Sequence, residues 1–322
     1  MVVSGVSTTK RVIGPSTLTY PLPIRDSRLT CERELVAGDG VSLEETPVDL
    51  RNVVTNVVEV ETGLWAANDQ ESSLSYPESG HRSMAEVEDD SYWFRHRAQV
   101  LVSVFERYPP AGCVFDIGGG NGYMVRAIRE SGHDSVLIEP GIDGCRTALR
   151  RGLAPVLNGT TDGLGVRPRS LASVGLFDVV EHIEDDRGFL GHVRDLMEPG
   201  GSVYLTVPAH QSLWSANDVS AGHYRRYSRS EISHLLTGVG LEVVYSTYMF
   251  RSLLLPVFLL RSVPYRLGVG ESKANTTDVH HLPSGAAGRW MGSSMAREVQ
   301  TIRAGGSIRS GTSVFAVAVE SK

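Results

Sequence analysis

Four glycines and one acid stand close together between Asp116 and Gly122, and this run is the part of the sequence best suited to bind a ligand. An apolar stretch before it, residues 114–117, indicates a strand, and an amphipathic stretch after it, residues 123–130, indicates a helix. Glycines let the backbone approach a bound molecule closely, and a helix N-terminus adds unpaired N–H groups. Such a turn is typical of a site for an adenosine-containing cofactor.

The spacing of the glycines distinguishes one such cofactor from another. Dinucleotide folds use G-x-G-x-x-G/A, and from Gly118 and Gly120 the third position is Tyr123, which is too large for close packing of helix on strand. The run fits Asp-x-Gly-x-Gly-x-Gly instead. An NAD(P)-dependent oxidoreductase is therefore the less favoured alternative, and a module that binds a cofactor for a catalytic partner is another.

A second acid, Glu139, ends the next stretch that indicates a strand, residues 135–139. In doubly wound sheets an acid about 20 residues past the glycine turn binds the ribose hydroxyls, because a carboxylate accepts both of their protons. We therefore expect Glu139 to bind a ribose. A solvated residue at the end of a strand is the alternative for this position.

The elements that would position these residues alternate between strand and helix patterns, which predicts a parallel sheet covered by helices. A helix at 91–108 precedes them, and a strand near 312–320 is expected to pair antiparallel at the end. The expected fold is α/β, a Rossmann-like, seven-stranded, mostly parallel sheet with helices on both faces and a small N-terminal β-rich arm. The expected ranges are strands at 113–117, 134–139, 154–157, 172–177, 201–207 and 241–247, and helices at 122–131, 143–151, 185–197 and 228–238.

The glycine run resembles motif I of class I S-adenosylmethionine-dependent methyltransferases. Residues 174–185 resemble the fourth strand and the following loop of that family, and residues 198–208, with Pro199-Gly200-Gly201, resemble its fifth strand. The likeness covers residues 75–320 and is to the small-molecule branch, which includes ubiquinone-type and natural-product enzymes. It implies S-adenosylmethionine as the cofactor.

The resemblance also assigns roles on the cofactor side. Asp116, Gly118 and Gly120 would lie near the methionine part, Glu139 would bind the ribose, and Asp178 would lie under the amino-acid end. The family contacts adenine near residues 160–163, where Asp162 is a weak candidate.

A cluster at residues 92–97 precedes the core, where the family has a cofactor lid. Arg97 in this cluster could pair with the methionine carboxylate. In the alternative interpretation, the aromatic residues of this helix simply pack on the sheet.

Three histidines are candidate proton acceptors on the acceptor side, His182, His210 and His223. His182 follows the fourth strand, at the edge where open α/β sheets bind their ligands, and histidine titrates near neutral pH. A methyl group on a sulfonium is already activated, so positioning of the acceptor can suffice without a base. Candidate substrate-binding residues are Glu181, Trp214, Tyr224 and Arg225.

The composition narrows the class of protein. The 322 residues suffice for one large domain with an appendage, and 41% hydrophobic and 21% charged residues are usual for a soluble globular protein. A net charge of −6 argues against a nucleic-acid partner. The three cysteines form no C-x-x-C pair, so we expect no disulfide framework and a cytoplasmic location. His280 and His281 have no third ligand near them, and no metal is predicted.

One apolar stretch, residues 253–260, is too short to span a bilayer, so no integral membrane segment is expected. It is either a buried segment that caps the sheet or an apolar wall for a lipid-like or aromatic substrate. We expect residues 1–70 to be an N-terminal extension and residues 71–322 to be the methyltransferase domain, with a cofactor-binding core at about 110–210 and an acceptor or cap region at about 209–310.

These patterns predict a methyltransferase that uses S-adenosylmethionine on a small, aromatic or partly apolar metabolite, by O-, N- or C-methylation in secondary metabolism. The alternative acceptor is a quinone or lipid at the membrane. The expected partner is the small-molecule acceptor, and a homo-oligomer is left open.

Overall fold

The computed structural model describes residues 48–68, 88–268 and 285–320, all within one compact unit, residues 40–322. The part of the predicted N-terminal β-rich arm before residue 48 lies outside the described residues, as do His280 and His281. The domain boundary expected at residue 70 stays a prediction.

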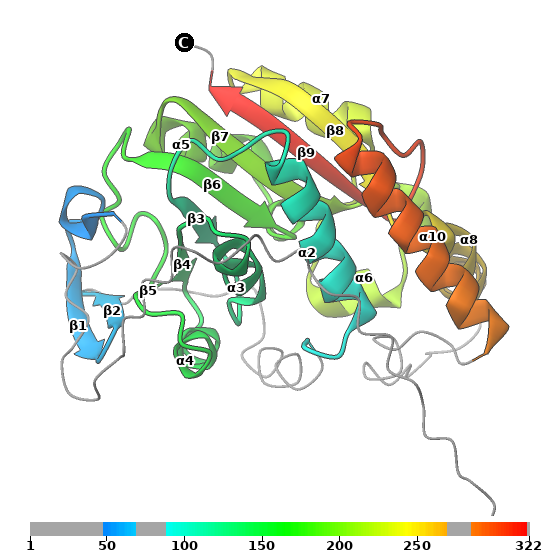
Figure 1. Cartoon of the computed structure of the whole chain (residues 1–322), viewed down its shortest axis with the longest axis horizontal. Helices are drawn as coiled ribbons and strands as arrows, with labels where there is room; N and C mark the ends of the chain where they lie inside the picture. Colours follow the sequence, from blue (N-terminus) through cyan, green and yellow to red (C-terminus); the bar gives the residue numbers. More distant parts are fainter. Residues whose placement is uncertain (1–47, 69–87, 269–284, 321–322) are drawn as a thin grey trace, which may run out of the picture. The chain divides into compact units, whose positions relative to one another are not determined.

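One sheet of nine strands, in the order β1-β2-β5-β4-β3-β6-β7-β9-β8, forms the centre of this unit (Figure 1). The strands from β2 to β7 in that order are all parallel, and β9 is antiparallel to β7 and β8. This confirms the expected mostly parallel sheet with an antiparallel final strand. The strands are β1 (Val57–Glu61), β2 (Leu64–Ala67), β3 (Val114–Ile117), β4 (Ser135–Glu139), β5 (Val156–Asn158), β6 (Leu171–Phe177), β7 (Met197–Pro208), β8 (Leu241–Met249) and β9 (Ser313–Glu320).

The predicted number of seven strands is two too low, because a hairpin from the N-terminal arm joins the sheet. β1 pairs antiparallel with β2, and β2 pairs parallel with β5 at the sheet edge. The side chains of Leu64, Ala66 and Ala67 are buried there. Burial of these apolar groups stabilises the pairing of the arm with the edge of the sheet.

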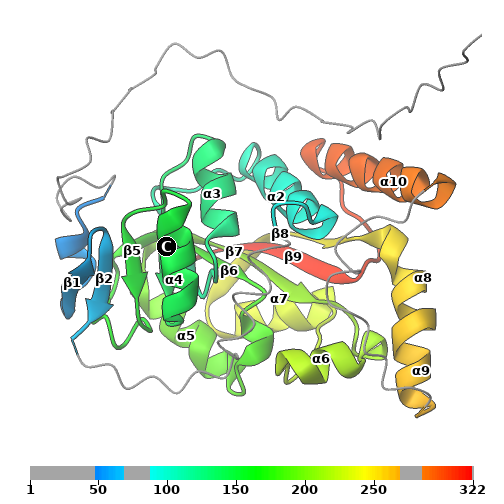
Figure 2. The same cartoon turned by 90° about the horizontal axis from the view of Figure 1, so that it is seen from below.

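Helices cover both faces of the sheet, as predicted: α2, α3 and α10 lie on one side and α5 and α7 on the other (Figure 2). The helices are α2 (Tyr92–Phe105), α3 (Tyr123–Glu130), α4 (Ile142–Arg150), α5 (Asp186–Leu196), α6 (Ala216–Ala221), α7 (Arg229–Gly238), α8 (Leu254–Val257), α9 (Val263–Arg266) and α10 (Ala286–Arg303). Short 3-10 turns include η2 (Val180–His182) and η3 (Gln211–Leu213), and the π-helical turn η5 (Phe258–Ser262) joins α8 to α9. Each predicted core helix is present within a few residues of its expected ends.

The parallel register brings the carboxyl ends of the central strands to one edge. Asp116 on β3 pairs with Gly175 on β6, and Ile117 on β3 pairs with Ile138 on β4. The loops that follow β3, β4 and β6 therefore leave the sheet side by side. This is the edge at which open α/β sheets bind ligands.

The apolar stretch at residues 253–260 is not the buried cap that was one of its two interpretations. It forms short helices in which Leu253 is buried, whereas Leu255, Leu259 and Leu260 are exposed by 63%, 51% and 74%. Within the described ranges no helix combines the length and hydropathy that a membrane span requires.

A buried carboxylate, Glu298 on α10, joins α2 and the end of β8. Its oxygens accept the backbone N–H groups of Phe250 and Arg251 at 2.9 and 2.6 Å, and His96 Nε2 on α2 lies 3.0 Å away. Glu298 and His96 are both buried. This contact holds the C-terminal helix against the helix that leads into the core.

We expect Glu298→Ala to lower the free energy of unfolding by about 2–5 kcal/mol, because two buried N–H groups and an imidazole lose their partner. Urea unfolding measures this change. Glu242→Ala, on the exposed face of β8, is the matched control and should change stability little. Equal stability of both variants would contradict the role of Glu298.

Candidate active site

The glycine loop after β3 lies directly against Asp116. Gly118, Gly120 and Gly122 have φ values of 71°, 58° and 74°, a region that glycine enters without strain. A Cβ at Gly119 would lie 2.3 Å from Asp116 Oδ2. The backbone can thus cross the acid only because these positions lack side chains.

Asp116 is fully buried, and neither of its carboxylate oxygens has a hydrogen-bond partner among the described residues. Burial raises the pKa of Asp116 to about 7, against the lowering effect of nearby Arg97, and Glu139 raises it further. An uncompensated acid under a glycine loop fits a ligand that brings a positive charge.

Glu139, at the end of β4, also binds the glycine loop. Its Oε2 accepts the backbone N–H of Gly120 at 2.9 Å, and its Oε1 accepts that of Gly141 at 2.6 Å. Both sequence-predicted acids therefore lie against the glycine loop. Each carboxylate oxygen has more than one lone pair, so Glu139 can still accept ribose hydroxyl protons.

Arg97 on α2 forms an ion pair with Asp178, which follows β6. Thr206 Oγ1 donates to the other oxygen of Asp178 at 2.8 Å, and the Arg97 guanidinium lies 4.3 Å from the ring centroid of Trp93. The ring of Trp93 stacks on Phe250 at 5.6 Å. The aromatic cluster thus packs on neighbouring elements and also brings Arg97 to the cofactor edge.

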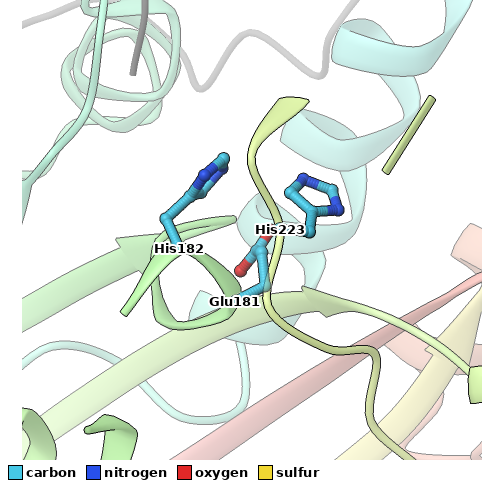
Figure 3. A group of neighbouring side chains, drawn as sticks. All are labelled: Glu181, His182 and His223. Carbon is cyan, nitrogen blue, oxygen red and sulfur yellow. The ribbon is translucent and has the colours of Figure 1, made fainter. Parts of the chain in front are cut away.

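Glu181, His182 and His223 form a cluster beside this ion pair (Figure 3). Glu181 and His182 come from η2, and His223 comes from the segment after α6. Burial, and to a lesser extent Asp178, raises the pKa of Glu181 well above its ordinary range. Burial and the neighbouring His223 lower the pKa of His182 to about 4, so this ring is uncharged at neutral pH. The two rings lie 4.7 Å apart, edge to face.

His223 is oriented by Asp218, a residue that the sequence analysis missed. His223 Nδ1 lies 2.9 Å from Asp218 Oδ1, and Arg226 Nε binds the same oxygen at 2.7 Å. The backbone N–H of Tyr224 donates to the carbonyl of Glu181 at 2.8 Å. A local signal for Asp218 existed, because Ser215 and Asp218 have the spacing of a capping box, which the structure contains.

Glu88 also escaped sequence analysis, because nothing near it in sequence marks it. Asn121 Nδ2 in the glycine loop donates to Glu88 Oε1 at 3.0 Å, and Arg151 NH1 donates to Glu88 Oε2 at 2.7 Å. Glu88 and Asn121 are buried. Residues just before α2 therefore hold the loop in place.

The remaining candidates are His210, Trp214, Tyr224 and Arg225, which lie outside this cluster. His210 stacks on Tyr248 at 4.8 Å, and Tyr224 is 48% exposed. Arg225 forms an ion pair with Asp186 at 2.7 Å. This ion pair balances the positive charge of the Arg225 guanidinium, which was expected to bind the acceptor. Trp214 is half-buried at the end of η3.

A pocket of about 400 Å³ lies next to His210. Its walls are mainly apolar side chains of η3, α8 and η5. The lining residues are His210, Ser212, Leu213, Leu254, Leu255, Phe258 and Ser310.

The strand order, the antiparallel last strand and the glycine loop over an acid define a Rossmann-like methyltransferase domain. Residues 92–246 match the family model described as a methyltransferase domain. The chain belongs through these residues to the class I S-adenosylmethionine-dependent methyltransferases. S-adenosylmethionine is the cofactor of this fold, and the oxidoreductase alternative lacks support.

A curated protein of Mycolicibacterium smegmatis, named a probable S-adenosylmethionine-dependent methyltransferase, is 25% identical over 172 residues. The match covers 52% of this chain and 66% of that relative, so the chain spans about two thirds of its length.

Two solved structures are similar at TM-scores of 0.48. A putative methyltransferase of Haloferax volcanii, solved with the Trm112 activator, is 17% identical, over 76% of this chain and 94% of that one. Phosphoethanolamine N-methyltransferase 2 of Haemonchus contortus is 19% identical, over 77% and 58%. Likeness at this level carries no information on the acceptor.

The raised pKa of Asp116 predicts how stability changes with pH. Its folded pKa of about 7 lies above the unfolded value near 3.9, so its contribution is present at acid pH and is lost as pH rises through 7. The free energy of unfolding of the cofactor-free protein should fall, through this group, by roughly 2–4 kcal/mol between pH 5 and pH 8. Asp116→Asn should lack this fall. Urea unfolding of both proteins at the two pH values checks it, and parallel pH curves would contradict it.

Proposed function

We propose that the protein transfers the methyl group of S-adenosylmethionine to a small, aromatic or partly apolar metabolite, at oxygen, nitrogen or carbon. The observation that carries this proposal is the buried carboxylate of Asp116 under the glycine loop, which has no hydrogen-bond partner among the residues described and lies at the same sheet edge as the cluster around Glu181. The carboxylate of Asp116 fits a cationic cofactor, and the cluster around Glu181 supplies polar groups beside that cofactor. A cytoplasmic location and a role in secondary metabolism are part of the same proposal.

The cofactor side follows from the groups at the loop. The bound cofactor supplies an activated methyl group on a sulfonium. Asp116 would face the ammonium of its methionine part, and Glu139 would accept the ribose hydroxyl protons while it holds the Gly120 amide. Arg97 would meet the carboxylate of the cofactor, with Asp178 fixing its direction.

The acceptor side follows from the pocket beside His210. Its leucines and Phe258 favour an aromatic or apolar group, while His210 and Ser212 offer polar contacts. Trp214 and Tyr224 remain candidates for contact with the acceptor. His182 and His223 are the candidate proton acceptors nearest to Asp178, and His210 would serve from the pocket.

A labelled methyl donor tests this function. The full chain, incubated with metabolite extracts and methyl-labelled S-adenosylmethionine, should label a small molecule and release S-adenosylhomocysteine.

Glu139→Ala should weaken binding of S-adenosylhomocysteine at least about tenfold, because hydrogen bonds to a charged group are lost. Calorimetry measures the affinity. Glu198→Ala, an exposed acid on β7, is the control, and an unchanged affinity in Glu139→Ala would sink the assigned role.

A quinone or lipid acceptor at a membrane is the second candidate, and the outward leucines of α8 and η5 favour it. Leu255, Leu259 and Leu260 are exposed near Arg251, Arg261 and Arg266, a composition typical of segments that lie on a bilayer surface.

We expect the protein to sediment with anionic phospholipid vesicles under this second candidate, and the double variant Leu255→Ser and Leu260→Ser to lose most of that binding. Val58→Ser with Val60→Ser, two exposed valines on β1, is the matched control. Failure of the wild-type chain to sediment would remove this candidate and leave the soluble acceptor.

A further inference from the structure

We propose that Glu181, His182 and His223 bind a divalent transition-metal cation at the carboxyl edge of the sheet. The sequence analysis predicted no metal and did not consider these three residues together, since His223 is far from the other two in the chain. The fold brings one possible ligand atom of each residue within 4.8 Å of the others. With metal–ligand bonds of about 2.0–2.2 Å, a tetrahedral site puts its ligand atoms about 3.4 Å apart, so the three side chains would have to approach one another by up to about 1.4 Å.

The first argument is the buried environment of the Glu181 carboxyl group. Its side chain is fully buried, and neither carboxylate oxygen has a hydrogen-bond partner in the part of the chain that the structure describes. The two arginines that act on it electrostatically are already paired, Arg97 with Asp178 and Arg226 with Asp218. A buried carboxylate without a partner is strongly unfavourable, and a bound cation removes the cost.

The second argument is the orientation of His223. Asp218 receives its Nδ1–H, which leaves Nε2 as the atom that can bind an ion. Metal-binding histidines usually donate their other ring N–H to a carboxylate in this manner. Arg226 binds both oxygens of Asp218 and so fixes the carboxylate that fixes the ring. The same arrangement would also suit a histidine base, and the experiment below separates the two.

The donor set indicates the class of ion. Two imidazoles and one carboxylate suit zinc and the neighbouring first-row metals better than Mg²⁺ or Ca²⁺, which prefer oxygen ligands. Three protein ligands leave a coordination position open, as catalytic zinc sites do.

The open position suggests a class of acceptor, an inference that rests on the proposed function. A hydroxyl group on the ion would lose its proton to solvent, and its oxygen would form the new bond to the methyl carbon. The carbon–sulfur bond breaks with its electron pair on sulfur, which yields S-adenosylhomocysteine. This favours phenols and other hydroxyl acceptors.

The test is a titration of the EDTA-treated full chain with ZnCl₂, followed by calorimetry and by metal analysis after gel filtration. We expect one zinc per chain. His223→Ala and Glu181→Gln should each weaken zinc binding at least tenfold. His192→Ala is the control, because His192 contacts Thr161 and Asp162, outside the cluster, and should bind zinc as wild type does.

Binding of S-adenosylhomocysteine, measured on the same variants, shows that they are folded and keeps this proposal separate from the proposed function. CoCl₂ provides a second readout, since the visible absorption bands of Co²⁺ depend on its ligands and should shift in His223→Ala. A wild-type chain that binds no zinc, or folded variants that bind it unchanged, would overturn the site. In that outcome His223 with Asp218 is assigned as a base.

Discussion

An excess of buried acidic side chains at the carboxyl edge of the sheet is the constraint on which the site depends. Asp116, Glu139 and Glu181 are buried there, and Asp178 is partly buried beside them. Arg97 neutralises one of these acids. Burial of the others is tolerable only with backbone N–H donors, a raised pKa or a cationic ligand. Glu139 uses the first of these, and Asp116 and Glu181 show the second.

The same constraint explains why two kinds of cation fit one edge. A sulfonium cofactor with an ammonium group suits the acid under the glycine loop. A metal ion suits the acid between two imidazoles. The Arg97–Asp178 ion pair affects both acids. Arg97 lowers the pKa of Asp116, and Asp178 raises the pKa of Glu181. Electrostatic interactions therefore connect the acid under the glycine loop with the cluster around Glu181.

The sheet was predictable because local sequence patterns and the order of the strands and helices along the chain indicate it. The strand before the glycine run, the acid at Glu139 and the alternation of strands and helices appear in the sequence with their residues in nearly the right places. The hairpin of β1 and β2 was only partly predictable, since an isolated Val-rich run does not say which sheet edge it joins. The outward leucines at 255–260 show a related limit, because hydropathy alone does not tell a buried face from an exposed one.

The sequence by itself determined the methyltransferase fold, the glycine loop and the acids that flank it, because each lies in a short contiguous motif. Only the tertiary structure decided that Arg97 pairs with Asp178 and that Arg225 pairs with Asp186. It also decided that Asp218 orients His223 next to Glu181. These contacts join segments from different elements. Their geometry follows from strand register and helix packing, which no local pattern of residues records.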